Sequence, residues 1–484
     1  MTLAKRVFRN SIFHVSSSFI DKVGALVFSI ILARLLQPEL FGTYYLALSI
    51  GFLFAAFTDI GVGETMIRWV SNALGKKNGS LARSYYRYLL KIKLLLMCIT
   101  SSIMFFASYF IANVIFSEPS LLLPLQIVAA YISLYSFFSF LHLTSVSIQV
   151  FKYGVIGKGI YEISRIVFVP LLIIWGLSIN GAILGICLAL ILTIVIMLYI
   201  LTKNYGFLFR GGIIPIKKRK ILKFLSFLSI SSISFMFFIN IDSVMLGFFL
   251  PNEYVGFYKI ASAIIFSFVG LISITYVLFP VFSQLESSRL ENVFNVAFRY
   301  SAILSIPTIF MLIWVAEPLI KVIYGHEYLQ AVLPLSILSF LIIESLLGSF
   351  FTTILTARKL PQYPAKIMVV STILNVIINF FLIQLFGILG AAVATVITRY
   401  FYSISLGIIV KLKLDISPHF ASIWKPLISS FLMLGFLFLL PKPHDIFLGI
   451  GEVLGAAVFY FVILYLIRGI GVDDWRYIKK ILKS

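Results

Sequence analysis

Ionisable side chains inside long apolar stretches are the residues of this sequence that could do chemistry. Such groups are costly at the depth of a lipid bilayer and usually serve a charged ligand, an ion or another charged side chain. Lysine and arginine could pair with phosphate oxygens, arginine in a bidentate manner. Aspartate and glutamate could take up a cation or a proton. The anion-binding candidates are Lys22, Arg165, Lys259 and Arg399, and the candidates for ion coupling or charge pairing are Asp21, Asp59, Asp242 and Glu344.

Some of these candidates could instead pair with neighbouring charges. Adjacent side chains on a helix do not face each other, so Asp21 and Lys22 each need a partner from another segment. Both lie about 12 residues, or roughly 18 Å, along a helix from Arg9, which puts them near the midplane of a membrane. Glu162 and Arg165 have i,i+3 spacing and could neutralise each other.

The remaining candidates also have structural interpretations. Asp59 could cap the helical segment that follows it, instead of binding a cation. Lys259 could extend its ammonium group to the outer membrane interface. Arg399 has no acidic neighbour in sequence, and Glu344 is the partner that another segment could offer it.

The sequence offers no metal site, cofactor site or catalytic motif. Its two cysteines, Cys98 and Cys187, both lie inside apolar runs, where inert buried thiols are expected. No Cys or His pairs have metal-ligand spacing. With neither a nucleotide-binding loop nor a catalytic triad, we expect a protein that is not an enzyme.

The composition indicates a polytopic membrane protein. Of the 484 residues, 61% are hydrophobic and 12% are charged, and the mean hydropathy is +1.07; soluble domains carry about 25% charged residues. About fourteen apolar segments are each long enough to cross a membrane as a helix. They are residues 11–35, 41–67, 85–116, 121–149, 155–176, 181–202, 225–249, 255–283, 293–324, 329–357, 363–386, 389–411, 419–440 and 446–467.

The distribution of basic residues predicts the topology. If the N-terminus is placed inside, most of the 39 Lys and Arg residues fall on alternate, inner connections, as the positive-inside rule requires. We therefore expect a multi-pass protein of the cytoplasmic membrane with both termini in the cytoplasm. Basic inner loops also explain the net charge of +21 without nucleic-acid binding.

A repeated stretch predicts two lobes. LLQPELFGTYYLA at 35–47 aligns with FLPNEYVGFYKIA at 249–261, each at the outer end of an odd-numbered segment. Six segments separate the copies, so we expect two like-oriented, pseudo-symmetric six-helix lobes, although chance similarity of two hairpins is the alternative. The predicted parts are an N-terminal lobe at 1–203, a basic cytoplasmic linker at 204–223, a C-terminal lobe at 224–413, and two extra helices with a basic tail at 414–484.

Residues 33–71, ARLLQPELFGTYYLALSIGFLFAAFTDIGVGETMIRWVS, resemble the N-terminal signature of the Wzx-type polysaccharide flippases. These form a branch of the multidrug/oligosaccharidyl-lipid/polysaccharide exporter superfamily. The resemblance rests on the ARLL-x-P-x-x-FG-x-Y turn, on the D-x-G-x-G of Asp59, Gly61 and Gly63, and on Arg68. IDSVMLG at 241–247, with the second copy of the repeat, is similar to the passage between the family's seventh and eighth spans.

The resemblance implies a flippase that moves lipid-linked (polyprenyl-diphosphate) oligosaccharides or polysaccharide repeat units across the membrane by alternating access. The basic candidates would line its cavity. Expected partners are that substrate and membrane lipids, with the basic loops on the anionic inner leaflet; glycan assembly enzymes and H⁺ or Na⁺ are further candidates. One alternative is an ion-coupled drug or cation antiporter of the MATE branch. The other is a membrane-embedded polyprenyl-sugar glycosyltransferase or polymerase.

Overall fold

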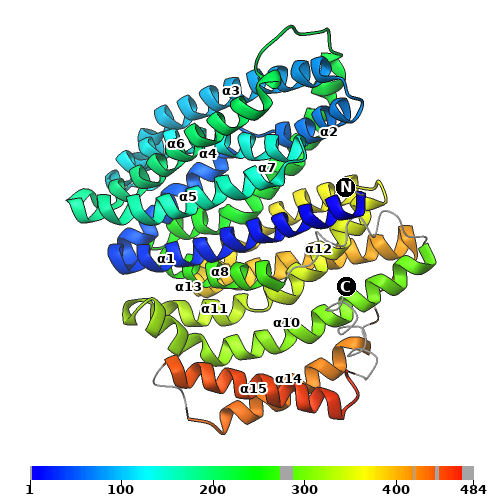
Figure 1. The fold of residues 1–484 in the computed structure, drawn as a ribbon. Helices are drawn as coiled ribbons and strands as arrows, with labels where there is room; N and C mark the ends of the chain where they lie inside the picture. The colour runs from blue at the N-terminus through cyan, green and yellow to red at the C-terminus, as the bar shows by residue number, and fades with distance from the viewer. Residues whose placement is uncertain (1–2, 273–286, 418, 420, 442–445, 471–484) are drawn as a thin grey trace. The chain divides into compact units, whose positions relative to one another are not determined.

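Helices make up most of the residues that the computed structural model of the chain describes (Figure 1). These are residues 3–272, 287–417, 419, 421–441 and 446–470, and they contain no strand. In a helix the backbone N–H and C=O groups bond to one another, so the chain needs no hydrogen-bond partners from the hydrocarbon of a membrane, which offers none. Large apolar side chains also cover the outside of the helices, and Phe106, Trp175 and Leu439 are each at least 75% exposed. Such surfaces are typical of contact with lipid.

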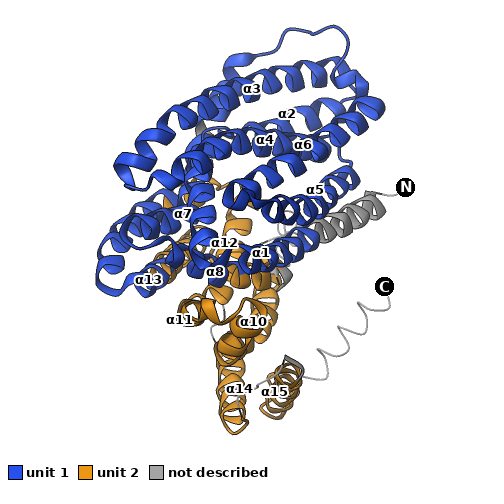
Figure 2. Cartoon of the chain, turned by 90° about the vertical axis from the view of Figure 1, so that its left-hand side faces the viewer, with its two compact units in different colours: residues 1–263, 368–395 blue, residues 264–367, 396–484 orange. Residues whose placement is uncertain are grey.

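The helices form two compact units, which Figure 2 draws in different colours. Unit 1 comprises Met1–Ala263 and Met368–Thr395, and unit 2 comprises Ile264–Ile367 and Val396–Ser484. Helices α8 (Asn252–Ile272) and α13 (Gln362–Leu414) contribute to both units. The lobe boundaries expected from the repeat stay a prediction, and residues 471–484 of the expected basic tail lie outside the described residues.

The other elements follow in chain order. Unit 1 contains α1 (Leu3–Ala55), α2 (Val62–Gly75), α3 (Gly79–Phe110), η1 (Ile111–Ile115), η2 (Pro119–Leu121), α4 (Leu122–Ser147), α5 (Phe151–Leu172), η3 (Ile173–Leu177), α6 (Ser178–Tyr205), η4 (Gly206–Leu208) and α7 (Lys218–Phe249). Unit 2 contains α10 (Ser287–Ile323), η5 (His326–Ala331), α11 (Val332–Leu338), α12 (Leu341–Ala357), α14 (Ala421–Phe438) and α15 (Ile446–Leu466).

Several helical stretches can cross a membrane. Among the described residues there are seven, and a bent pair of helices, His326–Leu338 with Leu341–Ala357, makes an eighth. The stretches Phe151–Leu208 and Gln362–Leu414 have 58 and 53 residues, more than twice the roughly 20 residues that a hydrocarbon core of ~30 Å requires. The predicted all-α polytopic membrane fold is confirmed. The number of fourteen spans and the cytoplasmic position of both termini stay predictions.

Sharp backbone turns divide two of the longest helices. In α1, Gln37 has φ 62° and ψ 168° and precedes Pro38, which cannot continue a helical hydrogen-bond ladder. In α13, Gly387 has φ 59° and ψ −135°, a conformation that glycine adopts without a steric penalty. Each of these long helices therefore consists of two helices joined by a tight turn. The two turns lie between predicted segments, the first between 11–35 and 41–67 and the second between 363–386 and 389–411.

The two copies of the repeated sequence contact each other within unit 1. The side-chain amide of Asn252 donates to Thr43 Oγ1 at 2.9 Å. It also donates to the two carboxylate oxygens of Glu118, at 2.8 and 2.7 Å. Asn252 is 8% exposed, so these bonds are shielded from solvent and hold together the start of α8, the turn of α1 and the connection before α4.

Candidate functional site

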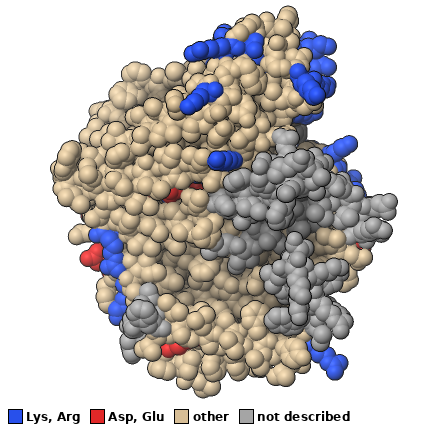
Figure 3. All heavy atoms as spheres, in the orientation of Figure 1, with Lys and Arg blue, Asp and Glu red and all other residues tan. Residues whose placement is uncertain are grey.

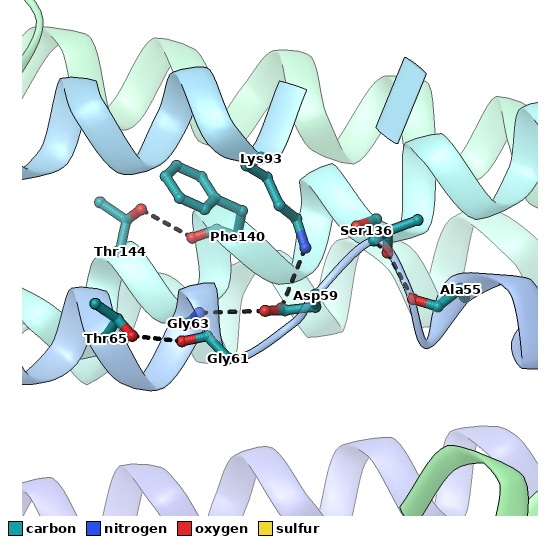
Figure 4. Close-up of polar contacts among 10 residues, drawn as sticks. Ala55, Asp59, Gly61, Gly63, Thr65, Lys93, Ser136, Phe140 and Thr144 are labelled. Carbon is teal, nitrogen blue, oxygen red and sulfur yellow. Dashed lines mark hydrogen bonds and ion pairs between the residues drawn. The ribbon is translucent and has the colours of Figure 1, made fainter. Parts of the chain in front are cut away.

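A broken helix brings Asp59 and Lys93 together in unit 1 (Figure 4). Helix α1 ends at Ala55, and α2 begins at Val62 after Gly61, whose φ of 83° suits glycine. Asp59 Oδ2 lies 3.1 Å from the Lys93 ammonium nitrogen. The side chain of Lys93 is fully buried, and that of Asp59 is 29% exposed. Lys93 lies within the predicted apolar segment 85–116, and the structure buries it well inside α3.

Asp59 also fixes the start of α2. Its Oδ1 accepts a hydrogen bond from the Gly63 N–H at 3.3 Å. Asp59 thus satisfies a free N–H in the first turn of α2 from two residues before the N-cap residue, Gly61. An ion pair to Lys93 and this hydrogen bond to α2 occupy both carboxylate oxygens.

Hydroxyl groups satisfy the other backbone groups around the break. Thr58 Oγ1 donates to the Ala55 carbonyl at 2.8 Å and accepts from Ser136 Oγ at 2.7 Å. Thr65 Oγ1 donates to the Gly61 carbonyl at 2.7 Å. Irregular backbone at membrane depth requires such partners, and Figure 4 shows these side chains on both sides of the break.

A second cluster of charges joins α1 and α5. Arg165 forms the predicted ion pair with the Glu162 carboxylate, and its guanidinium lies over the rings of Phe28 and Tyr161, at 4.5 and 5.2 Å from their centroids. The side chains of Arg165 and Glu162 are only 12% and 6% exposed. The helices approach closely here, because a Cβ atom at Gly24 would overlap the Glu162 carboxylate.

Asp21 and Lys22 have different surroundings. Asp21 Oδ2 lies 3.7 Å from Lys158 Nζ, in a pair that is partly exposed. Asp21 therefore has the partner from another segment that the sequence predicted. Lys22 is half-buried and forms no ion pair or hydrogen bond with another residue that the structure describes. The role of Lys22 in binding a ligand stays a prediction.

Asp242 on α7 is the centre of a buried hydrogen-bond network in unit 1. Its Oδ1 accepts from the Asn379 amide at 2.7 Å, and its Oδ2 accepts from Tyr258 OH at 3.0 Å and from Thr395 Oγ1 at 2.8 Å. Asp242 is 3% exposed, and its charge interacts with that of Lys259. Lys259 directly follows Tyr258, which donates to Asp242, so the two candidates lie in the same part of unit 1.

Glu344 occupies a comparable position in unit 2. It lies on α12, shortly after the 45° bend that separates α11 from α12. It is 2% exposed, its Oε1 accepts from Ser403 Oγ at 2.6 Å, and its charge interacts with that of Arg399. The predicted pairing of Glu344 with Arg399 is thus an electrostatic interaction inside one unit. The Arg399 guanidinium also lies 5.3 Å from the centroid of the Phe266 ring.

Sequence reasoning missed several of the side chains that complete these sites. They are Lys93 and Lys158, which lie within the predicted apolar segments 85–116 and 155–176, and the neutral partners Tyr258, Asn379, Thr395 and Ser403. An isolated amide inside an apolar run, such as Asn379, was the one signal available. The common cavity expected for the four basic candidates stays a prediction.

Known proteins share this arrangement of helices. The profile of the family described as polysaccharide biosynthesis protein matches residues 7–286, which is more than half of the chain. The chain belongs to this family. The family predicted from the sequence is therefore confirmed. The matched part of the family extends through α8 and contains the Asp59, Arg165 and Asp242 sites.

Individual relatives cover different parts of this family member. A probable low-salt glycan biosynthesis flippase of Haloferax volcanii is 30% identical over 230 residues, covering 46% of this chain and 48% of the relative. The chain thus matches about half the length of that protein. The lipid II flippase MurJ in an inward closed conformation has a similar structure, with a TM-score of 0.78, 16% identity, and coverage of 94% of this chain and 98% of MurJ.

The multidrug branch of the superfamily has the same fold at lower similarity. An inward-facing multidrug resistance transporter of the MATE family superposes with a TM-score of 0.59 and 12% identity over 84% of this chain and 94% of the transporter. Identities this low establish the fold alone. The fold is therefore common to glycan-lipid and drug transporters, and the side chains must decide between them.

Proposed function

We propose that the protein flips a lipid-linked saccharide, with a polyprenyl-diphosphate carrier, across the cytoplasmic membrane by alternating access. The observation that carries this proposal is the presence of paired ionic side chains among the apolar helices of a member of the polysaccharide biosynthesis family. The names of a glycan flippase relative and of a lipid II flippase with the same fold support it.

The chemistry of the substrate explains why such a protein needs buried charges. A diphosphate and a glycan cannot leave water for hydrocarbon without large desolvation costs. Lys22, Arg165, Lys259 and Arg399 are the groups that would pair with the phosphates while the polyprenyl tail stays in the bilayer. Lys22 comes first among them, since it has no described partner. Arg165 already binds Glu162 and offers a phosphate only the N–H groups that remain.

The direct test is transport by the purified protein in vesicles. A fluorescent polyprenyl-diphosphate saccharide should cross the bilayer in vesicles that contain the protein and not in empty vesicles. Lys22→Ala should slow this movement and Lys22→Arg should retain most of it, whereas Lys77→Ala, in an exposed connection, should have no effect. Normal movement with Lys22→Ala at normal protein levels would contradict the role of Lys22.

The fold similarity to a multidrug transporter keeps the antiporter alternative under test. The same vesicles can be loaded with a cationic dye and given a Na⁺ or H⁺ gradient. Efflux of the dye without movement of the saccharide lipid would favour the antiporter. Release of a shortened or lengthened glycan would instead indicate a glycosyltransferase or polymerase. We expect intact saccharide lipid on the opposite leaflet.

Ion coupling is the remaining part of the proposal. Asp242 accepts three hydrogen bonds in a buried site, and Glu344 accepts one beside Arg399. Asp59 and Asp21 are already paired with lysines. We therefore place Asp242 first among the four acidic candidates for responding to H⁺ or Na⁺.

A further inference from the structure

The connection between α6 and α7 carries an exposed apolar stretch between basic residues. Ile213 and Ile214, in the sequence IIPI, are 58% and 38% exposed. Arg210 precedes this stretch, the run KKRK at 217–220 follows it, and all five of these basic residues are exposed. Apolar side chains flanked by cations are typical of a segment that lies in the headgroup region of an anionic membrane.

Side chains of α3 hold the backbone of this connection. The Arg83 guanidinium donates to the carbonyl oxygens of Phe207 and Gly212, at 2.5 and 2.8 Å. The Ile214 N–H donates to Ser84 Oγ at 2.9 Å. The connection is therefore fixed against α3, although it has little regular secondary structure of its own.

A glycine allows this close approach. Gly211 has φ 110°, and its carbonyl accepts from Arg87 at 3.2 Å. A Cβ atom at Gly211 would lie 2.5 Å from the Arg83 guanidinium. The φ angle therefore favours glycine at this position, and a Cβ atom would displace the Arg83 guanidinium.

Fixing the backbone leaves the isoleucine side chains available to lipid. Unsatisfied backbone groups are costly in an apolar environment, and four of the polar groups between residues 207 and 214 already bond to α3. Leu208, which is fully buried, and Phe209, whose ring contacts that of Tyr86 at 5.3 Å, face the protein. Ile213 is the most exposed large apolar side chain of the connection, at 58%, and Ile214 and Phe207 are 38% and 37% exposed.

The charges around the stretch are of one sign. Residues 76–93 and 203–224 contain no Asp or Glu. Figure 3 shows Lys and Arg gathered at the end of unit 1 where this connection lies, with no acidic atoms at that end of the face drawn. Lys218 also lies over the ring of Tyr88 on α3, 5.7 Å from its centroid. Such a surface is complementary to anionic headgroups.

We propose that residues 210–220 form a binding segment for anionic phospholipid, in which Ile213 and Ile214 insert among the acyl chains and the flanking cations bind the headgroups. The α3 residues Arg83, Ser84 and Arg87 position the segment. An acidic protein would match the charges but not the two exposed isoleucines at their centre. This proposal is independent of the transported substrate, so it can hold or fail separately from the proposed function.

Depth measurements on the full-length protein test the proposal. In a Cys98→Ala background, which leaves only the buried Cys187, Ile213→Cys is labelled with an environment-sensitive fluorophore. The protein is reconstituted in phosphatidylcholine alone or mixed with phosphatidylglycerol. We expect emission shifted to the blue and quenching by nitroxide lipids in the mixed vesicles, and less of both in phosphatidylcholine. A label at Asn204→Cys, exposed on the polar end of α6, should not respond.

Two variants separate charge from geometry. Replacing the run 217–220 by glutamines should abolish the difference between the two lipid compositions. Gly211→Ala keeps every charge but disturbs the contact with Arg83, and it should weaken the quenching by nitroxide lipids. The proposal would be overturned if iodide in the water quenched the label at residue 213 equally in both kinds of vesicle with no other substitution. It would also be overturned if nitroxide lipids quenched the label equally in both. The comparison of the two lipid compositions uses the native basic run, so the proposal can be tested even if the glutamine variant does not fold.

Discussion

Gly42 lies directly against the main chain of Asn252, so that a Cβ atom on Gly42 would overlap the Asn252 carbonyl group. The reciprocal contact also exists, since a Cβ atom on Gly256 would lie 3.1 Å from the Pro38 carbonyl oxygen. In the aligned copies of the repeat, Gly42 corresponds to Gly256 and Pro38 to Asn252. Reciprocal contacts of corresponding residues are the property of a twofold axis. The two copies of the repeat therefore contact each other reciprocally within unit 1, and the two like-oriented lobes stay a prediction.

Enlarging Gly42 should therefore separate the two copies of the repeat. Gly42→Val places three carbons where the Asn252 main chain lies, and overpacking of this kind costs about 1–3 kcal/mol or more. We expect less folded protein in the membrane and less polysaccharide export, measured by fluorescence-detected gel filtration and complementation. Gly435→Val is the matched control, because nothing lies within 4 Å of its Cβ position. Equal behaviour of the two variants would contradict the contact.

The Asp59–Lys93 pair should be more sensitive to losing one partner than to losing both. Asp59→Asn leaves a fully buried lysine without its carboxylate, which costs about 3–5 kcal/mol for a buried pair. The double variant Asp59→Asn with Lys93→Met removes the uncompensated charge and should recover part of that stability. Thermal unfolding of the purified variants measures the difference. Additive losses in the double variant would show that the two side chains act independently.

Asp242 should govern any dependence of transport on an ion gradient. Asp242→Asn retains the size of the side chain and removes the charge, so we expect transport that no longer responds to a Na⁺ or H⁺ gradient in vesicles. Tyr258→Phe removes one hydrogen bond to Asp242, at about 1–3 kcal/mol, and should change the ion concentration required without abolishing the response. If Asp242→Asn keeps the full response, the coupling site lies elsewhere.

Glu344 should stabilise unit 2 through Ser403 and Arg399. Ser403→Ala removes the 2.6 Å hydrogen bond to a buried carboxylate, which should cost about 1–3 kcal/mol. Glu344→Gln should cost more, because it also removes the charge that interacts with Arg399. The melting temperatures of the variants should fall in that order. Ser345→Ala is a suitable control, because its bond to Glu344 is long, at 3.4 Å.

The sequence predicted the charged residues of the candidate sites better than their partners. The i,i+3 pair of Glu162 and Arg165 is local, and helix geometry alone brings such residues together. The partners of Asp59 and Asp21 are Lys93 and Lys158, on helices that periodicity cannot orient. The positive-inside rule counts both lysines on the cytoplasmic side, and it does not show which acidic side chain each one contacts.

The sequence by itself determined that this is a helical membrane protein of the polysaccharide biosynthesis family, because long apolar runs, turn residues and local motifs act over short distances. Only the tertiary structure decided what each buried charge contacts. Asp242 meets Asn379 and Thr395 across more than a hundred residues of chain. Neutral hydroxyl and amide groups are common in apolar helices, and packing alone selects the few that surround a carboxylate.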